Sequence, residues 1–272
     1  MKNLKRKICV GLAGAALALS LTTPAFAVTE VLSIHGRNIW QEAKTQMVGE
    51  TTYGSIRTMA NYLRPDAEVS WKNGTAWVKG DGLTVSARPG DLYMKINDRV
   101  IYLPHGVRAV NGSVLVPVRA FAEALGSQVD WSHQQGVTIA PGNGAPVKAP
   151  YTEDELYWMS RIIHAESGGE PLLGKLAVGT VVLNRVASPE FPNTIYGVIF
   201  DRKWGVQFTP AYNGMIYKEP SQESILAAKM VLEGARAAGD SLYFLAPSLT
   251  NNHWIMENRE YVTTIGEHWF YR

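Results

Sequence analysis

Glu166 combines a residue type and a position that suit acid–base chemistry. Before it, Leu156, Met159 and Ile163 recur every three or four residues, which is the spacing of one apolar face of a helix. Three residues after Ile163, the same face reaches Glu166. Burial raises the pKa of a carboxyl group because it disfavours the charged form, and a general acid that works near neutral pH needs such a shift. The pattern also fits an exposed carboxylate at a frayed helix end, or one that pairs with a nearby arginine.

The flanking residues indicate two helices that hold this carboxyl group at a corner. Thr152 and Glu155 form a capping box at the start of the first helix, and Gly168-Gly169 is expected to end it. Pro171 favours the first turn of a second helix, and residues 172–186 are apolar nearly all round. A helix that is apolar on every side packs in the centre of its domain. The sequence therefore predicts a rigid corner against the core, where a catalytic group is held precisely.

Six segments of the second half occur in a fixed order: 164–171, 177–186, 191–199, 207–208, 242–244 and 265–271. Together they resemble the catalytic domain of spore cortex-lytic enzymes and related cell wall hydrolases, over essentially all of residues 151–272. The resemblance implies a fold similar to goose-type lysozymes and lytic transglycosylases, mainly α-helical with a small β element. It also implies cleavage of glycan between N-acetylmuramic acid and N-acetylglucosamine. The family's catalytic glutamate falls on Glu166, with Ala165 and Ser167 in place of the family's usual glycine and alanine.

The resemblance is compatible with chemistry that uses a single carboxyl group. Most glycosidases place two carboxylates on opposite sides of the scissile bond, and Glu170 is the nearby candidate for the second. Its place between two glycines and a proline favours a role in positioning the corner or contacting substrate, with a nucleophilic role as the alternative. A lytic transglycosylase needs one acid, which protonates the leaving oxygen and then helps the sugar's 6-hydroxyl close a 1,6-anhydro ring. The sequence favours this reaction over hydrolysis, and both product types stay open.

Further polar and aromatic residues of the second half suit a glycan-binding cleft. Gln207 and Phe208 are expected on a loop, and Tyr243 in a short strand, where they supply an amide and sugar-stacking rings. The resemblance places Gln207, Phe208 and Tyr243 at family positions, so we expect substrate contacts from them. Core packing is the expectation for three tryptophans: Trp204, Trp254 and Trp269.

Two other functions fit parts of the sequence. A zinc-dependent amidase acting on the peptide stem of the same polymer would use ligands such as His164, His253 and His268, but the sequence contains no HExxH motif. A non-catalytic wall-binding protein would have no use for the acid corner at Glu166. We therefore expect an enzyme that acts on peptidoglycan glycan strands and needs neither a metal nor another cofactor.

The first half contains an internal repeat. Residues 55–63 match residues 117–125, and the sequence around Trp71 matches the sequence around Trp131. Each copy reads as a short helix followed by a β-hairpin, and two further strand–turn–strand patterns lie between the copies. The second copy resembles the accessory domain named after the N-terminal region of copper amine oxidases, a name that implies no copper chemistry here. The predicted fold class is therefore α+β, with a β-rich module of two helix–hairpin repeats followed by a mainly α-helical, lysozyme-like domain.

Charge and turn residues divide the chain further. Residues 1–27 read as a secretory signal peptide, with a basic start, a short apolar run and a small-x-small end, and an uncleaved anchor helix is the alternative. Residues 141–150 contain three prolines and two glycines and are expected to form an exposed linker without regular structure. The expected parts are thus a signal peptide (1–27), an accessory domain (28–140), the linker, and a catalytic domain (151–272).

Composition excludes several classes of protein. Without the four bases of residues 1–27, 22 Lys and Arg side chains face 24 Asp and Glu, which is not the balance of a nucleic-acid binder. The single cysteine, Cys9, supports neither a disulfide scaffold nor a cysteine-ligated zinc site, and it lies within the predicted signal peptide. We expect a protein exported to the cell envelope, with no membrane span after processing. The accessory domain is expected to bind the envelope or a protein partner.

Overall fold

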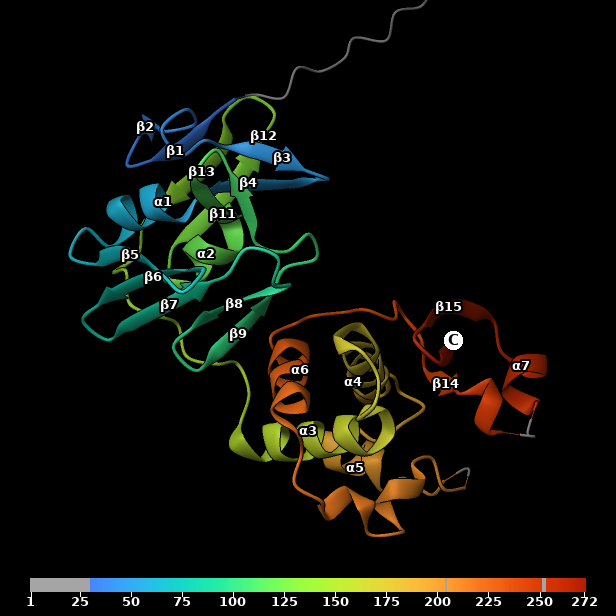
Figure 1. The fold of residues 1–272 in the computed structure, drawn as a ribbon. Coiled ribbons are helices and arrows are strands. Elements are labelled where there is room, and N and C mark those ends of the chain that lie inside the picture. The colour runs from blue at the N-terminus through green and yellow to red at the C-terminus, as the bar shows by residue number, and fades with distance from the viewer. Residues whose placement is uncertain (1–29, 204, 251–252) are drawn as a thin grey trace, which may run out of the picture.

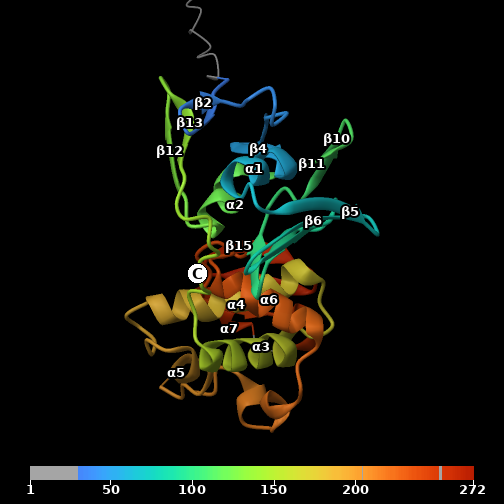
Figure 2. The same ribbon diagram turned by 90° about the vertical axis from the view of Figure 1, so that its left-hand side faces the viewer.

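The computed structural model describes residues 30–203, 205–250 and 253–272. The predicted signal peptide lies outside the described residues, as does Trp204. A β-rich half is followed by a mainly helical half, which confirms the predicted α+β class (Figure 1). Figure 2 shows the β-rich half above the helical half. Among the described residues, no helix combines the length and the apolar character needed to cross a bilayer.

The β-rich half consists of three sheets with two short helices between them. The strand orders are β12-β13-β1-β2, β10-β11-β4-β3 and β5-β6-β7-β8-β9. The pairing of β1 with β13 is parallel, and the other pairs in these sheets are antiparallel. The elements are β1 (Leu32–Ile34), β2 (Arg37–Asn38), β3 (Gln46–Val48), β4 (Thr51–Ser55), α1 (Ile56–Leu63), β5 (Glu68–Lys72), β6 (Thr75–Gly80), β7 (Leu83–Ala87), β8 (Tyr93–Ile96), β9 (Arg99–Tyr102), β10 (Arg108–Val110), β11 (Ser113–Pro117), α2 (Val118–Ala124), β12 (Gln128–Ser132) and β13 (Gly136–Ala140).

The predicted repeat is present in the fold. The first copy is α1 followed by the β5–β6 hairpin, and the second is α2 followed by the β12–β13 hairpin. The strand–turn–strand patterns between them form the β8–β9 and β10–β11 hairpins. At the turn of the latter, Asn111 and Gly112 both have positive φ angles, of 47° and 73°, which explains why an Asn-Gly pair occurs there. The apolar faces of α1 and α2 pack with the sheets into one buried cluster.

The helical half is built around α3, α4 and α6, and a three-stranded antiparallel sheet of order β14-β16-β15 lies beside them (Figure 1). Thr152 caps α3 through the capping box with Glu155 that the sequence predicts. Helix α4 is buried along most of its length and contacts both α3 and α6, so it is the central helix of this half. The elements are α3 (Glu153–Ser167), α4 (Leu172–Ala187), α5 (Ile195–Ile199), the 3-10 helices η1 (Thr209–Ala211) and η2 (Met215–Tyr217), α6 (Gln222–Leu232), β14 (Tyr243–Leu245), η3 (Pro247–Leu249), α7 (Trp254–Asn258), β15 (Tyr261–Ile265) and β16 (His268–Tyr271).

Residues 141–150 contain neither helix nor strand, but they are not a free tether. The Arg64 guanidinium donates to the carbonyl of Gly144 (3.0 Å), and the backbone N–H of Val147 donates to the carbonyl of Ala124 (3.0 Å). Gly144 is buried. Six of its ten residues are exposed, as expected for a linker, while the buried Gly144 and these two hydrogen bonds attach the segment to the β-rich half.

The two halves are joined through the β8–β9 hairpin and α6. Arg99 at the start of β9 forms a bidentate ion pair with Glu233, which follows α6, with N–O distances of 2.8 and 2.6 Å. The Glu233 side chain is only 2% exposed. Nearby, the Lys229 ammonium donates to the carbonyl of Asp98 (2.9 Å). Val100 belongs to the same buried cluster as residues of α3, α4 and α6, so the hairpin completes the core of the helical half.

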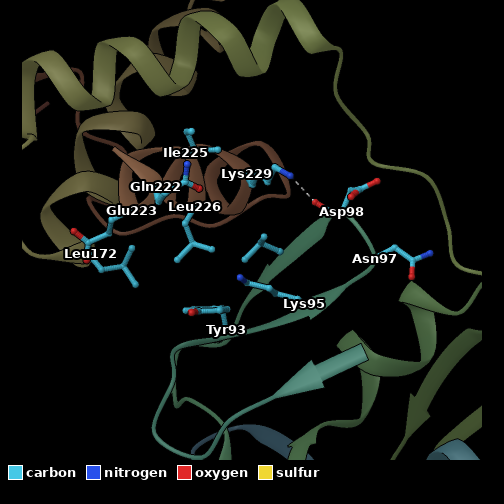
Figure 3. A pocket seen from close by; sticks show the side chains of 11 residues that line it. Tyr93, Lys95, Asn97, Asp98, Leu172, Gln222, Glu223, Ile225, Leu226 and Lys229 are labelled. Carbon is cyan, nitrogen blue, oxygen red and sulfur yellow. Dashed lines mark hydrogen bonds between the residues drawn. The ribbon is translucent and has the colours of Figure 1, made fainter. Parts of the chain in front are cut away.

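A pocket of about 540 Å³ lies at this junction. Figure 3 shows Tyr93 and Lys95 of β8 facing Leu226 of α6 across it, with the bond from Lys229 to Asp98 at one side. Both halves therefore supply its walls. The junction fixes the β-rich half against α6, the helix that also packs on α3.

Candidate active site

Glu166 lies in the last turn of α3, at the corner that the sequence predicts. The apolar face that leads to it is buried, since Met159 and Ile163 are both fully inaccessible. Glu166 itself is partly buried, and the loss of hydration raises the pKa of its carboxyl group to about 7, although the positive charge of Arg185 acts in the opposite direction. Arg161, an alternative ion-pair partner, instead contacts Glu219 at 3.1 Å.

Glycine is required at the end of α3. A Cβ atom on Gly168 would lie 2.6 Å from the carbonyl oxygen of His164, and real Cβ atoms do not approach a backbone atom so closely. The Ser167 hydroxyl donates to the Ile163 carbonyl (2.6 Å), which ties the last turn of α3 to the helix. Pro171 is the residue before the first turn of α4, one position earlier than the sequence predicts. The chain thus turns sharply directly after Glu166.

Glu170 ties this corner to the C-terminal hairpin. One carboxylate oxygen lies 3.7 Å from Nδ1 of His268, and the other accepts the backbone N–H of Glu267 (3.2 Å). Gly266, in the same β turn, has a positive φ of 60°, and a Cβ atom there would lie 1.7 Å from Oε2 of Glu170. The buried ammonium group of Lys175 contacts the Glu170 carbonyl. Both oxygens of Glu170 are therefore directed at β15–β16, and this favours a positioning role over a nucleophilic one.

Arg185 on α4 is the other arginine that the sequence offers as a partner of Glu166, and its contacts with the aromatic residues of this site were not predicted. It is 4% exposed, and its Nε donates to the carbonyl of Leu242 (2.7 Å). Its guanidinium lies over the rings of Phe191, Phe208 and Tyr243, at 4.9, 5.0 and 5.6 Å from their centres. Within the described part of the chain, its Nη1 has no hydrogen-bond partner. The available signal was an arginine in a mostly apolar helix, whose other polar residues are Lys175, Thr180 and Asn184.

A pocket of about 750 Å³ extends from this aromatic group. Two residues expected to contact substrate, Gln207 and Tyr243, line it together. Trp254 also lines it and is 50% exposed, so the expectation of core packing is wrong for this residue. It lies on α7, a five-residue helix without buried residues, near the Arg259 guanidinium, which is 5.3 Å from the ring centre of Trp254 and 4.5 Å from that of Tyr243.

Two other aromatic residues differ from expectation. Phe208, expected to stack on sugar, is only 1% exposed and packs among the buried residues of the helical half, where its ring centre lies 6.3 Å from that of Phe244. It does not line the pocket, and its ring has no face open to a ligand. Trp269, expected in the core, is 38% exposed, because β16 directs its neighbours His268 and Phe270 inward and Trp269 to the other face.

The three histidines of the rival zinc interpretation lie on different elements: His164 on α3, His253 exposed just before α7, and His268 on β16. Nδ1 of His164 lies 3.4 Å from the Ser224 hydroxyl, and His268 contacts Glu170. Among the described residues, no group of three or more His, Cys, Asp or Glu side chains is arranged to hold a metal ion. Asn184, on the buried helix α4, donates both amide hydrogens to the carbonyls of Gly239 and Ser241, at 2.9 Å each, so its amide holds the chain after α6 against α4.

Comparison with known families matches both halves of the chain. Residues 169–271 match the family described as Cell Wall Hydrolase, and residues 33–140 match the Copper amine oxidase N-terminal domain. The first match begins three residues after Glu166. Both resemblances inferred from the sequence are therefore confirmed.

Similar proteins cover the second half. A spore cortex-lytic enzyme of Bacillus cereus is 36% identical over 127 residues, which is 47% of this chain and 48% of that enzyme, so the chain spans about half the length of this relative. The catalytic domain of the germination-specific lytic transglycosylase SleB from Bacillus anthracis is 36% identical, and the match covers 46% of this chain and all of that domain, with a TM-score of 0.42. The cell wall hydrolase CwlJ of Oceanobacillus iheyensis is 33% identical over 103 residues, 36% of this chain and 72% of that protein. The chain therefore belongs to the cell wall hydrolase family.

Proposed function

We propose that this protein is an exported enzyme that cleaves peptidoglycan glycan strands between N-acetylmuramic acid and N-acetylglucosamine, with Glu166 as its general acid. The observation that carries the proposal is the pKa of about 7 that burial gives to the Glu166 carboxyl group. Such a group still holds its proton near neutral pH and releases it readily to a leaving oxygen. The description of relatives as spore cortex-lytic enzymes supports cortex peptidoglycan as the substrate.

The reaction we propose uses the same carboxyl group twice. Glu166 first gives its proton to the glycosidic oxygen while the bond from that oxygen to the anomeric carbon of the muramic acid breaks. The 6-hydroxyl oxygen of the same sugar then bonds to the anomeric carbon, and its proton passes to the Glu166 carboxylate. The product end is a 1,6-anhydro sugar, the acid is regenerated, and no water is consumed. Each proton transfer of this kind accelerates a reaction by roughly 10²–10⁴-fold.

The contacts of Glu170 support a mechanism with one carboxylate. An enzyme that retains configuration through a covalent intermediate needs a second carboxylate on the opposite side of the bond. Glu170 is the nearby candidate, and both of its oxygens contact the β15–β16 hairpin. We therefore assign Glu170 to positioning the corner that carries Glu166.

The pocket beside Arg185 supports glycan binding. Gln207 supplies an amide, and Tyr243 and Trp254 supply rings, in a hollow of about 750 Å³. Sugars are bound by aromatic faces together with a few hydrogen-bonding groups, and this lining has that composition. We propose that residues 151–272 form the catalytic domain and residues 28–140 an accessory domain, and that residues 1–27 direct export.

The test is digestion of purified spore cortex peptidoglycan by the full chain and by Glu166→Gln. The matched control is Glu153→Gln, which removes an exposed carboxylate from the other end of the same helix. We expect released glycan fragments to fall by at least about 100-fold for Glu166→Gln and to stay unchanged for Glu153→Gln. Near wild-type release by a folded Glu166→Gln variant would remove Glu166 from the reaction.

A further inference from the structure

Two tryptophans are exposed at equivalent positions of the two helix–hairpin repeats. Trp71 on β5 is 57% exposed, and Trp131 on β12 is 55% exposed. Each comes two residues after a valine that packs on the core of the β-rich half, Val69 or Val129. Residues two apart lie on one face of a strand. Each tryptophan is therefore on the same face as its buried valine, but beyond the edge of the core. Core packing explains why valine occurs at positions 69 and 129, but it does not explain why tryptophan occurs at positions 71 and 131.

The strands that carry the two rings are held by equivalent contacts. In the first repeat, Nη1 of Arg57 donates to the carbonyl of Val69 (2.9 Å). In the second, Nη1 of Arg119 donates to the carbonyl of Val129 (2.5 Å). Each bond ties the helix of a repeat to the strand just before its tryptophan, and each strand is paired along its length with the next strand of its hairpin. A ring held on a rigid hairpin loses little freedom when it binds a ligand.

The surroundings of the rings indicate a sugar more than a protein surface. Within residues 30–140, the other large hydrophobic side chain that is exposed is Met47, so the rings do not belong to a broad apolar patch. Polar residues flank both rings, Lys72 and Asn73 in one repeat and Ser132 and His133 in the other. A protein partner requires a contiguous interface with an apolar centre. A pyranose ring instead needs one aromatic face for its C–H groups and neighbouring polar groups for its hydroxyls.

We propose that Trp71 and Trp131 form two equivalent saccharide-stacking sites, which hold the glycan strand of peptidoglycan on the β-rich half. The choice of this saccharide rests on the proposed function of the helical half. A polymer of repeated sugars offers a ligand to each site, and occupation of both sites raises the apparent affinity beyond that of either site alone. The junction through Arg99 and Glu233 keeps these sites at a fixed position relative to the helical half while it cleaves.

The test measures binding of the full chain to purified glycan strands from which the peptide stems have been removed. All proteins carry Glu166→Gln, so that the strands are not cut during the measurement. We expect Trp71→Ala and Trp131→Ala each to weaken binding by about fivefold, and the double variant to weaken it by more than tenfold. The matched control is Trp77→Ala, because Trp77 lies on β6 of the same sheet as Trp71 and on the opposite face from the core residues Ala76 and Val78.

Unchanged binding of glycan strands by the folded double variant would overturn the inference. Loss of retention on intact envelopes, with binding to purified strands unchanged, would assign the rings to a protein partner and would also overturn it. A parallel assay in the active background separates this inference from the proposed function. The Trp71→Ala/Trp131→Ala enzyme should cut short soluble fragments as fast as wild type, whereas failure of the proposed function would leave both enzymes without cleavage.

Discussion

Replacing Glu166 by glutamine should stabilise the protein at neutral pH while it abolishes cleavage. The folded chain holds a proton on this carboxyl group up to a pKa of about 7, whereas the value for the free side chain is 4.5. Between these two values the folded state binds more protons than the unfolded state, so stability is full below pH 4.5 and is lost as the pH rises through 7. Glutamine is neutral at every pH and does not undergo this loss.

The magnitude follows from the pKa shift. One pKa unit corresponds to about 1.4 kcal/mol, so a shift from 4.5 to about 7 gives roughly 3 kcal/mol. We expect Glu166→Gln and wild type to have similar free energies of unfolding near pH 4, and the variant to be more stable by up to about 3 kcal/mol at pH 8. Burial of the Glu166 carboxyl group thus favours the reaction, but it lowers the stability of the fold once the group is ionised.

Urea unfolding of the full chain at a series of pH values measures this difference. All other ionisable groups are common to the two proteins, so the difference between their stabilities isolates Glu166. The control is Glu153→Gln, whose lost carboxylate is exposed and whose stability should follow that of wild type across the series. A difference between wild type and Glu166→Gln that stays constant from pH 4 to 8 would refute the raised pKa and the acid role built on it.

Three other predictions follow from the contacts described above. Arg99→Ala leaves the buried Glu233 carboxylate without its partner, so it should lower the free energy of unfolding by about 3 kcal/mol and speed proteolysis between the halves. Stability and proteolysis equal to those of wild type would contradict a junction held by this ion pair. Glu170→Gln removes the charge that faces His268 and should reduce cleavage partially, and complete loss with a normal melting temperature would instead indicate a second catalytic carboxyl group. EDTA should leave the cleavage rate unchanged, and loss of activity that zinc restores would support a metal-dependent amidase.

The parts of the fold that the sequence predicts correctly depend on local signals. The capping box of Thr152 and Glu155 sets the start of α3, and the apolar spacing along that helix places Glu166 at its buried end. The repeated pattern around Trp71 and Trp131 predicts two helix–hairpin units because each unit is closed by contacts between near neighbours in the chain.

The features that the sequence analysis missed depend on contacts between distant segments. Arg99 and Glu233 are 134 residues apart, and nothing in either local pattern indicates that they pair. The burial of Phe208, just before η1, and the exposure of Trp254, on α7, follow from how these short segments pack on the helical half, and residue type alone suggested the reverse for both. Burial in such short segments is set by tertiary packing, which has no sequence period.

The most direct test of the central claim is mass spectrometry of the ends that wild type creates when it digests cortex peptidoglycan in ¹⁸O-labelled water. If Glu166 acts alone as acid and then as base, the new ends are 1,6-anhydro sugars without ¹⁸O, and Glu166→Gln yields almost none of them. New reducing ends that carry ¹⁸O would show that water attacks the anomeric carbon, and this result would contradict the single-carboxyl mechanism.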